Sequence, residues 1–269
     1  MENNVLAIYQ RVAQTIVASV QEEWTKAYML IKKQDGHISN IGSGRYTDSS
    51  MYLKPFVIRD DELVFELADL LDDLHVITTA GGNNRWNFLW FALLPSGAYE
   101  IDFIWNQDEE DKITHLSQTQ SLSRPARSAD LRAFTQAQAA HRSPLVYELL
   151  VRETVKLIPE AWTIARVSLR EVGLGIIEHH AAYQSLGEPA EDALTITDSW
   201  PALLAVEELR RLKTESGHPD WQQVSFQIEV TGTYRATFTT KPAAENASPT
   251  GYTAEGQWLA ADAATPLTT

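Results

Sequence analysis

The stretch Trp86-Asn-Phe-Leu-Trp-Phe-Ala-Leu-Leu-Pro-Ser-Gly-Ala-Tyr-Glu-Ile-Asp-Phe103 decides the fold expected for this chain of 269 residues. Its two ends are mostly apolar and Pro95-Ser-Gly97 is typical of a turn, so the stretch predicts a two-stranded hairpin. A second stretch with the same spacing is Trp221-Gln-Gln-Val-Ser-Phe-Gln-Ile-Glu-Val-Thr-Gly-Thr-Tyr-Arg-Ala-Thr-Phe238. In both, an aromatic residue follows the tryptophan by five positions, a glycine by eleven, a tyrosine by thirteen and a phenylalanine by seventeen. The same hairpin is therefore expected twice.

The similarity between the two parts of the chain begins before the hairpins. Tyr9 precedes Trp24 by fifteen residues, and Tyr147 precedes Trp162 by fifteen residues. The intervals from Trp24 and Trp162 to the tryptophans that open the hairpins are 62 and 59 residues. Because internal repeats decide an architecture, this agreement predicts a tandem duplication. The alternative is one domain that carries two unrelated hairpins.

Each copy is expected to contain a helix, two or three strands, a second helix and two strands. Apolar residues at helical spacing predict the first helix of the first copy: Val5, Ile8, Val12, Ile16 and Val20. Asp60 is expected to cap the second helix, and Trp200-Pro201 begins the equivalent helix of the second copy. The predicted fold class is α+β, with two similar α/β units whose helices pack on an antiparallel sheet.

The same pattern divides the chain into four segments. They are a first unit (1–106), a polar linker with a short helix (107–141), a second, diverged copy (142–241) and a tail rich in Pro, Ala and Thr (242–269). We expect a turn at Asp35-Gly36 between two strands. The tail is expected to be loosely ordered, although Tyr252 and Trp258 are positioned to dock back on the body.

Composition narrows the classes of function. The chain has no cysteine, which excludes disulfides, thiolate metal sites and a cysteine nucleophile. It has no apolar run long enough for a membrane helix and no basic signal region at the N-terminus, so we expect a cytoplasmic protein that does not enter a membrane. The net charge of −14 is shared by both halves of the chain. Such a charge repels nucleic acid and favours a basic protein partner.

Residue patterns for catalysis are weak. Glu178 precedes His179 and His180, but no third ligand stands at metal spacing. The pair Gly42-Ser-Gly44 lacks the ending of a phosphate loop. The residues shared by the two copies are mostly apolar, and Glu22 and Glu160 are the matching acids near them. We therefore expect no catalytic residues, metal or cofactor, and a protein that is not an enzyme.

Acidic residues gather in two places that are candidates for binding. The segment 60–73 holds seven acids and no base, whereas the corresponding helix of the second copy is mixed in sign. Acids also follow a tryptophan in the segment 105–111, and an aromatic residue beside acids can serve as a binding anchor. Solvated surface is the alternative reading of both. The candidate binding residues are Asp60, Asp61, Glu66, Asp69, Asp72, Asp73, Trp105, Asp108, Glu109, Glu110 and Asp111.

Four stretches of the first copy carry a resemblance to a known family: Ile8-Tyr-Gln-Arg-Val-Ala, Glu23-Trp-Thr-Lys-Ala-Tyr-Met, Trp86-Asn-Phe-Leu-Trp-Phe and Gly97-Ala-Tyr-Glu-Ile-Asp-Phe. In these the chain resembles the YezG-like antitoxins and immunity proteins of bacterial polymorphic toxin systems. Ile158-Pro-Glu-Ala-Trp in the second copy looks like the Ile-Pro-x-x-Trp of that family. The chain departs from the family in being a tandem of two copies.

The resemblance implies a function without catalysis. An immunity protein binds one cognate toxin domain and occludes its active site, and an acidic one suits a basic toxin of the nuclease or ADP-ribosyltransferase type. Two other hypotheses fit the charge and the doubled units. One is an adaptor or chaperone for a secreted effector, and the other is an enzyme that uses acids in a cleft between the copies.

Overall fold

The structure, a computed structural model, divides the chain into two compact units, Met1–Leu131 (unit 1) and Arg132–Thr269 (unit 2). The boundary falls inside the segment 107–141 that was expected to join the two copies. The described residues are 2–34, 37–39, 41–50, 52–80, 82, 85–173, 175–188, 190–215, 221–240 and 251–258.

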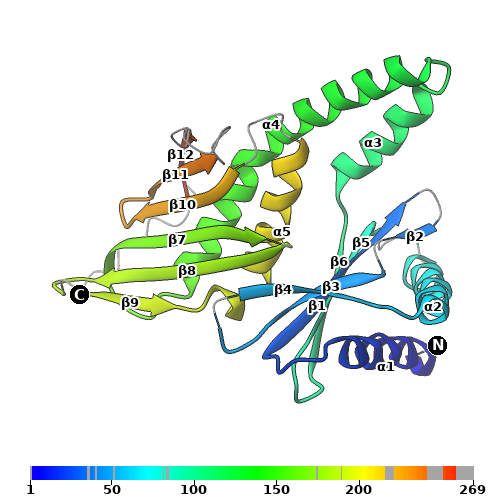
Figure 1. Cartoon of the computed structure of the whole chain (residues 1–269), viewed down its shortest axis with the longest axis horizontal. Helices are drawn as coiled ribbons and strands as arrows, with labels where there is room; N and C mark the ends of the chain where they lie inside the picture. The colour runs from blue at the N-terminus through cyan, green and yellow to red at the C-terminus, as the bar shows by residue number, and fades with distance from the viewer. Residues whose placement is uncertain are drawn as a thin grey trace. The chain divides into compact units, whose positions relative to one another are not determined.

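Unit 1 is an antiparallel sheet with two helices side by side against one face (Figure 1). Its elements are α1 (Glu2–Ser19), β1 (Lys26–Gln34), β2 (His37–Ser39), β3 (Ser43–Thr47), β4 (Tyr52–Val57), α2 (Asp61–Thr79), β5 (Phe88–Leu93), β6 (Tyr99–Ile104) and α3 (Gln107–Gln118). The strand order is β4-β3-β1-β5-β6, and β2 pairs with β1. The core lies between the sheet and the pair α1 and α2.

The local sequence explains these elements. In α1, the predicted stripe turns inward, and Ile8, Val12 and Ile16 are buried. The side chain of Asp60 accepts hydrogen bonds from the backbone N–H groups of Glu62 and Leu63, so it caps α2 as predicted. Gly97 has a positive φ of 85° at the hairpin turn between β5 and β6, a conformation that glycine adopts without a Cβ clash.

Unit 2 combines α4 (Arg124–Lys156), which begins in unit 1, with antiparallel strands of its own and a further helix. Its other elements are β7 (Trp162–Gly173), β8 (Ile176–Ser185), β9 (Glu191–Leu194), a short 3-10 turn (Ile196–Asp198), α5 (Trp200–Glu215), β10 (Trp221–Glu229), β11 (Thr233–Thr240) and β12 (Gly251–Gln257). The strand order is β9-β8-β7-β10-β11-β12. Helices and antiparallel sheets in both units confirm the predicted α+β class.

The two units share one order of strands, with β4-β3-β1-β5-β6 matching β9-β8-β7-β10-β11. The hairpin registers agree as well. Phe91, five residues after Trp86, pairs with Ile101, and Phe226, five residues after Trp221, pairs with Ala236 ten residues further on in the same way. The matched spacings in the sequence are therefore matched positions in the two sheets.

Aromatic contacts account for the spacing of seventeen residues. Trp86 lies 5.3 Å from Phe103 between ring centroids, and Trp221 lies 6.2 Å from Phe238. Trp221 begins β10 and Trp86 stands two residues before β5, and each contacts the phenylalanine near the end of the second strand of its hairpin. The contact needs a fixed loop length, because a change of one residue would turn one of the two rings to the other face of the sheet.

Two segments differ from the sequence-based expectation. Residues 107–141, expected to be a linker with a short helix, contain α3 and the first half of the 33-residue α4. The first part of the expected loose tail forms β12, in which Tyr252 stacks on Phe238 with ring centroids 4.4 Å apart. Trp258 also docks, with its ring 6.1 Å from Trp162. The segment 107–141 is thus more helical than expected, because polar and charged residues also suit the exposed side of a helix.

The turn predicted at Asp35-Gly36 lies outside the described residues, although β1 and β2 on either side of it pair as expected. Within the described part of the chain, none of the helices combines the length and the apolar character required to cross a bilayer.

Candidate functional site

The predicted acidic strip lies on α2, and its acids fall into two groups. Asp60 is the helix cap, Glu66 forms a bidentate ion pair with Arg11 of α1, and Asp72 pairs with Lys33 of β1. Glu66 and Asp72 thus join α2 to α1 and β1, whereas Asp60 stabilises the start of α2 itself. The remaining acids of the helix, Asp61, Glu62, Asp69 and Asp73, are exposed.

Two apolar side chains stand among the exposed acids. Phe65 is 71% exposed and Val76 is 66% exposed, although both belong to a helix whose apolar residues otherwise face the core. The positions 61, 62, 65, 69, 73 and 76 share one side of a helix at 3.6 residues per turn. We call Asp61, Glu62, Phe65, Asp69, Asp73 and Val76 the outer face of α2.

Sequence reasoning found the acids of this face but missed Phe65 and Val76. The signal was present, because both residues stand out of phase with the buried Leu67, Leu71 and Leu74 of the same helix. Together with the exposed acids on the same side of α2, these two residues make the outer face of α2 the candidate binding surface.

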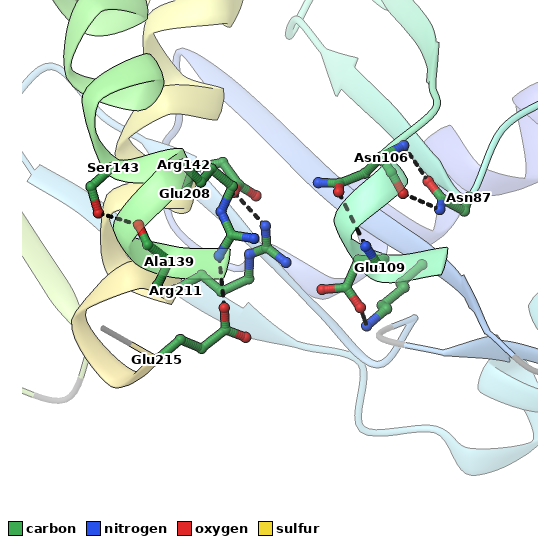
Figure 2. Close-up of polar contacts among 10 residues, drawn as sticks. Asn87, Asn106, Glu109, Ala139, Arg142, Ser143, Glu208, Arg211 and Glu215 are labelled. Atoms are coloured by element: carbon green, nitrogen blue, oxygen red, sulfur yellow. Dashed lines mark hydrogen bonds and ion pairs between the residues drawn. The ribbon is translucent and has the colours of Figure 1, made fainter. Parts of the chain in front are cut away.

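The second acidic block forms the first turn of α3, where its acids suit the helix dipole. Asn106 caps this helix and is held by Asn87, which exchanges two hydrogen bonds of 2.7 Å with the Asn106 backbone (Figure 2). Glu109 is buried and pairs with Lys32 of β1. It therefore cannot meet a partner at the surface, unlike the exposed Asp111.

Trp105, the aromatic residue predicted to anchor a partner, is half-buried and already in contact with a cation. The guanidinium of Arg85 lies 4.0 Å from the centre of its ring, and its indole N–H donates to Gln107 at 3.1 Å. The acids of α2 and those of α3 are not brought together. Lys33 reaches α2 and its neighbour Lys32 reaches α3, and consecutive strand residues point to opposite faces of a sheet.

A hollow of about 420 Å³ lies next to the start of α2. The end of α1, β4 and the first turn of α2 form its walls, with Val20, Pro55 and Leu63 among the apolar residues and Glu22 and Asp60 among the acids. Apolar walls with carboxylates suit a long basic side chain, because its aliphatic stem can lie on the walls while the charged end stays near an acid.

The two matching acids of the sequence occupy matching places in the two units. The Tyr183 hydroxyl donates to the Glu160 carboxylate at 3.1 Å. In unit 1, Tyr46 hydrogen bonds to Glu22, and burial together with this bond raises the pKa of Tyr46. Tyr46 pairs with Ala27 in the sheet, and Tyr183 pairs with Ala165, each alanine standing three residues after its tryptophan.

The surroundings of the two Glu–Tyr pairs differ. Lys54 lies 2.9 Å from Glu22 and 2.7 Å from Asp48 in unit 1. Burial works to raise the pKa of Asp48, but hydrogen bonds from Lys54 and Ser50 outweigh it and lower this pKa to about 2. In unit 2, the Ser185 hydroxyl lies 2.7 Å from Glu160 instead. The shared pair joins the loop before β1 to β3 in unit 1 and the loop before β7 to β8 in unit 2, which is a structural task.

Unit 2 contains a partly buried charged cluster between α4 and α5 (Figure 2). Arg142 is 7% exposed and lies 2.7 Å from Glu215 and 3.6 Å from Glu208, which also pairs with Arg211 at 2.6 Å. Each charge of this cluster faces an opposite charge, which is the condition for burying it at low cost. The cluster therefore fixes α5 against α4.

Among the described residues, no three or more His, Asp and Glu side chains are grouped in a way that could hold a metal ion. His179 is buried, whereas the side chain of His180 is 50% exposed. Burial, with a smaller effect of His180, lowers the pKa of His179 to about 4, so the ring is neutral at neutral pH.

No protein-family model matches this chain, and no curated protein matches it significantly.

Proposed function

We propose that this protein is a cytoplasmic immunity protein that binds a basic toxin domain and blocks its active site without catalysis. The observation that carries the proposal is the outer face of α2. It joins four exposed carboxylates to two exposed apolar side chains, Phe65 and Val76. An interface needs both parts, because apolar anchors supply affinity and rim charges supply steering and specificity.

The negative charge of the outer face of α2 favours a partner with a basic surface. Arg11 and Lys33 are engaged with Glu66 and Asp72, so the exposed acids Asp69 and Asp73 set the sign of the surface. A toxin that acts on nucleic acid or on a dinucleotide needs positive charge to hold phosphates, and such a surface is complementary to this one. Complementary fields raise association rates, which suits a protein that must capture its toxin quickly.

The hollow beside Asp60 extends the same surface. A lysine or arginine of the toxin would place its stem along Pro55 and Leu63 and its charged end near Asp60 or Glu22. We further propose that the two units arose by tandem duplication, a view supported by the common strand order and hairpin register. In this proposal unit 1, which carries the acidic helix, is the half that binds the toxin.

The first test is co-expression with the toxin domain encoded by the adjacent upstream gene, scored by cell survival and by purification of a stoichiometric complex. We expect survival and a complex. Phe65→Ser should then weaken binding at least tenfold, measured by biolayer interferometry, because it removes the exposed aromatic anchor. Leu122→Ser is the matched control, since Leu122 is exposed at 40% in the turn between α3 and α4.

Three results would count against the proposal. Death of the cells would contradict immunity. Survival without a complex would favour the adaptor or enzyme hypotheses. Equal effects of Phe65→Ser and Leu122→Ser would move the interface away from α2 and leave the immunity function standing.

A further inference from the structure

The edge strand β6 of unit 1 is open along its outer side. Among the described strands, β6 pairs with β5 alone and ends the strand order of unit 1. All six of its residues are at least partly exposed, whereas all six residues of β5 are buried. An edge strand presents unpaired N–H and C=O groups, which are a template for a further strand.

Unit 2 fills the corresponding edge with its own chain. There β12 pairs with β11 over seven residue pairs, from Thr233–Gln257 to Thr239–Gly251 (Figure 1). Under β12 the inward residues Tyr234, Ala236 and Phe238 are all buried to 5% exposure or less. β12 thus serves as an internal example of what a strand added to this kind of edge covers.

The residues of β6 match those of β11 one for one. By distance from the hairpin tryptophan and by register, Tyr99, Ile101 and Phe103 correspond to Tyr234, Ala236 and Phe238. Tyr99 is 37% exposed, and Ile101 and Phe103 are half-buried. Unit 1 therefore has an apolar stripe at the same positions as unit 2, and none of the described strands covers it.

The charge at this edge is reversed between the units. Arg235 of β11 pairs with Glu255 of β12 at 2.8 Å. Glu100 holds the position of Arg235 in unit 1, and Asp102 holds the position of Thr237. Among the described residues, Glu100 pairs loosely with Lys26, at 4.0 Å, and its side chain is 55% exposed.

We propose that the β6 edge binds an extended basic segment of a protein partner, which adds to the sheet as an antiparallel strand. By the register of β12, the segment has lysine or arginine opposite Glu100 and Asp102, a small residue opposite Ile101 and an aromatic residue opposite Phe103. It has glycine opposite Tyr99, because a Cβ on Gly256 of β12 would lie 2.5 Å from the Tyr234 hydroxyl. Main-chain bonds give such binding its strength, and the alternate side chains give it specificity.

The negative charge of Glu100 and Asp102 favours a basic segment over two other possible occupants of the β6 edge. A second copy paired through β6 would bring Glu100 and Asp102 close to the same acids of its partner, and like charges across strands are destabilising. A swapped β12 from another copy would place Glu255 opposite Glu100. Neither penalty applies to a basic segment. The inference does not depend on the toxin-binding role of α2, because it rests on another element of unit 1.

The test uses the full-length protein and a labelled peptide with the β12 sequence, residues 251–257, carrying Thr253→Lys and Glu255→Lys. Fluorescence anisotropy at low salt measures affinity, and hydrogen exchange locates the binding. We expect this peptide to bind at least tenfold more tightly than the unchanged β12 peptide. Hydrogen exchange should slow over residues 99–104. The double variant Glu100→Lys, Asp102→Lys should reverse the preference between the two peptides.

A matched control separates strand addition from general attraction. Glu23→Lys with Glu188→Lys changes the net charge by the same amount at two exposed sites that are not part of β6, and it should leave the preference for the basic peptide in place. The proposal is overturned if both double variants lose binding equally, if neither peptide binds, or if protection appears outside 99–104. A dimer protected at 99–104 without peptide would also overturn it, in favour of a second copy as the occupant. Failure of the toxin experiment would leave the peptide result unaffected.

Discussion

Lys32 and Lys33 are consecutive residues of β1, yet they pair with acids of different helices, Lys32 with Glu109 of α3 and Lys33 with Asp72 of α2. The alternation of a strand sends the two ammonium groups to opposite faces of the sheet. The two acidic blocks of unit 1 are therefore separate surfaces. A single flat surface of a partner can contact only one of them directly.

The first prediction follows from this separation. We expect Asp69→Lys with Asp73→Lys to slow association with the toxin domain by at least tenfold at low salt, because the steering charge is reversed. Glu110→Lys with Asp111→Lys, the same charge change on α3, should alter the rate by less than threefold. Stopped-flow association rates at two salt concentrations measure both. Equal effects would show that net charge, rather than the outer face of α2, governs capture.

The second prediction concerns the buried pair of Lys32 and Glu109. Glu109→Ala leaves the Lys32 ammonium without its carboxylate in a site where the lysine side chain is 19% exposed. We expect the free energy of unfolding to fall by about 3 kcal/mol, as for other broken buried pairs. Urea denaturation measures it. Glu110→Ala is the control and should change stability by less than about 0.5 kcal/mol. Lys32→Met combined with Glu109→Leu should recover part of the loss.

The third prediction separates two glycines of one short motif. A Cβ on Gly44 would lie 2.6 Å from Phe56 Cε1 and would overlap the backbone carbonyl oxygen of Tyr28, whereas a Cβ on Gly42 would meet nothing within 4 Å. Gly44→Ala should therefore destabilise the protein by about 3 kcal/mol through overpacking, and Gly42→Ala should be neutral or slightly stabilising. Thermal unfolding of the two variants measures this difference in stability. A neutral Gly44→Ala would mean that β1 and β3 can separate at that point.

The fourth prediction is a dependence on pH through His179. Burial lowers the pKa of this ring to about 4 from its ordinary value of 6.5, so the folded protein keeps it neutral while the unfolded chain binds a proton below about pH 6.5. Stability from this group is present above pH 6.5 and is lost as the pH falls toward 4. The loss amounts to about 3 kcal/mol of unfolding free energy.

Urea denaturation between pH 7 and pH 4 measures that loss as the difference between the wild type and His179→Leu. The variant should lose less stability over this range because it no longer carries the buried ring. His180→Gln should follow the wild type, since His180 is half exposed. Parallel pH curves for the wild type and His179→Leu would contradict the prediction.

Much of the framework was readable from the chain alone. The spacing around the four tryptophans predicted two hairpins, and the structure forms both with the same register. The stripe that begins at Val5 predicted α1, and Asp60 predicted the start of α2. These features succeed because periodicity, caps and turns are local, and a few residues specify each of them.

Other features of the structure depend on contacts between residues that are far apart in the sequence. Glu109 looked like one acid of a solvated run, but its side chain is buried against Lys32, 77 residues earlier in the chain. β12 lies in a segment of small and polar residues and forms because β11 offers an edge with an apolar stripe. Composition describes how such a segment interacts with water, and it carries no information on which neighbour will cover it.

The sequence by itself determined the first helix, the start of the second, the matched hairpins and the excess of negative charge, because each of these depends on residues close together in the chain or on a sum over it. Only the tertiary structure decided which acids are structural and which are exposed, and which sheet edge is covered. Those outcomes depend on long-range pairing, such as that of Lys32 with Glu109 and of β11 with β12, in which two distant segments remove one another from water.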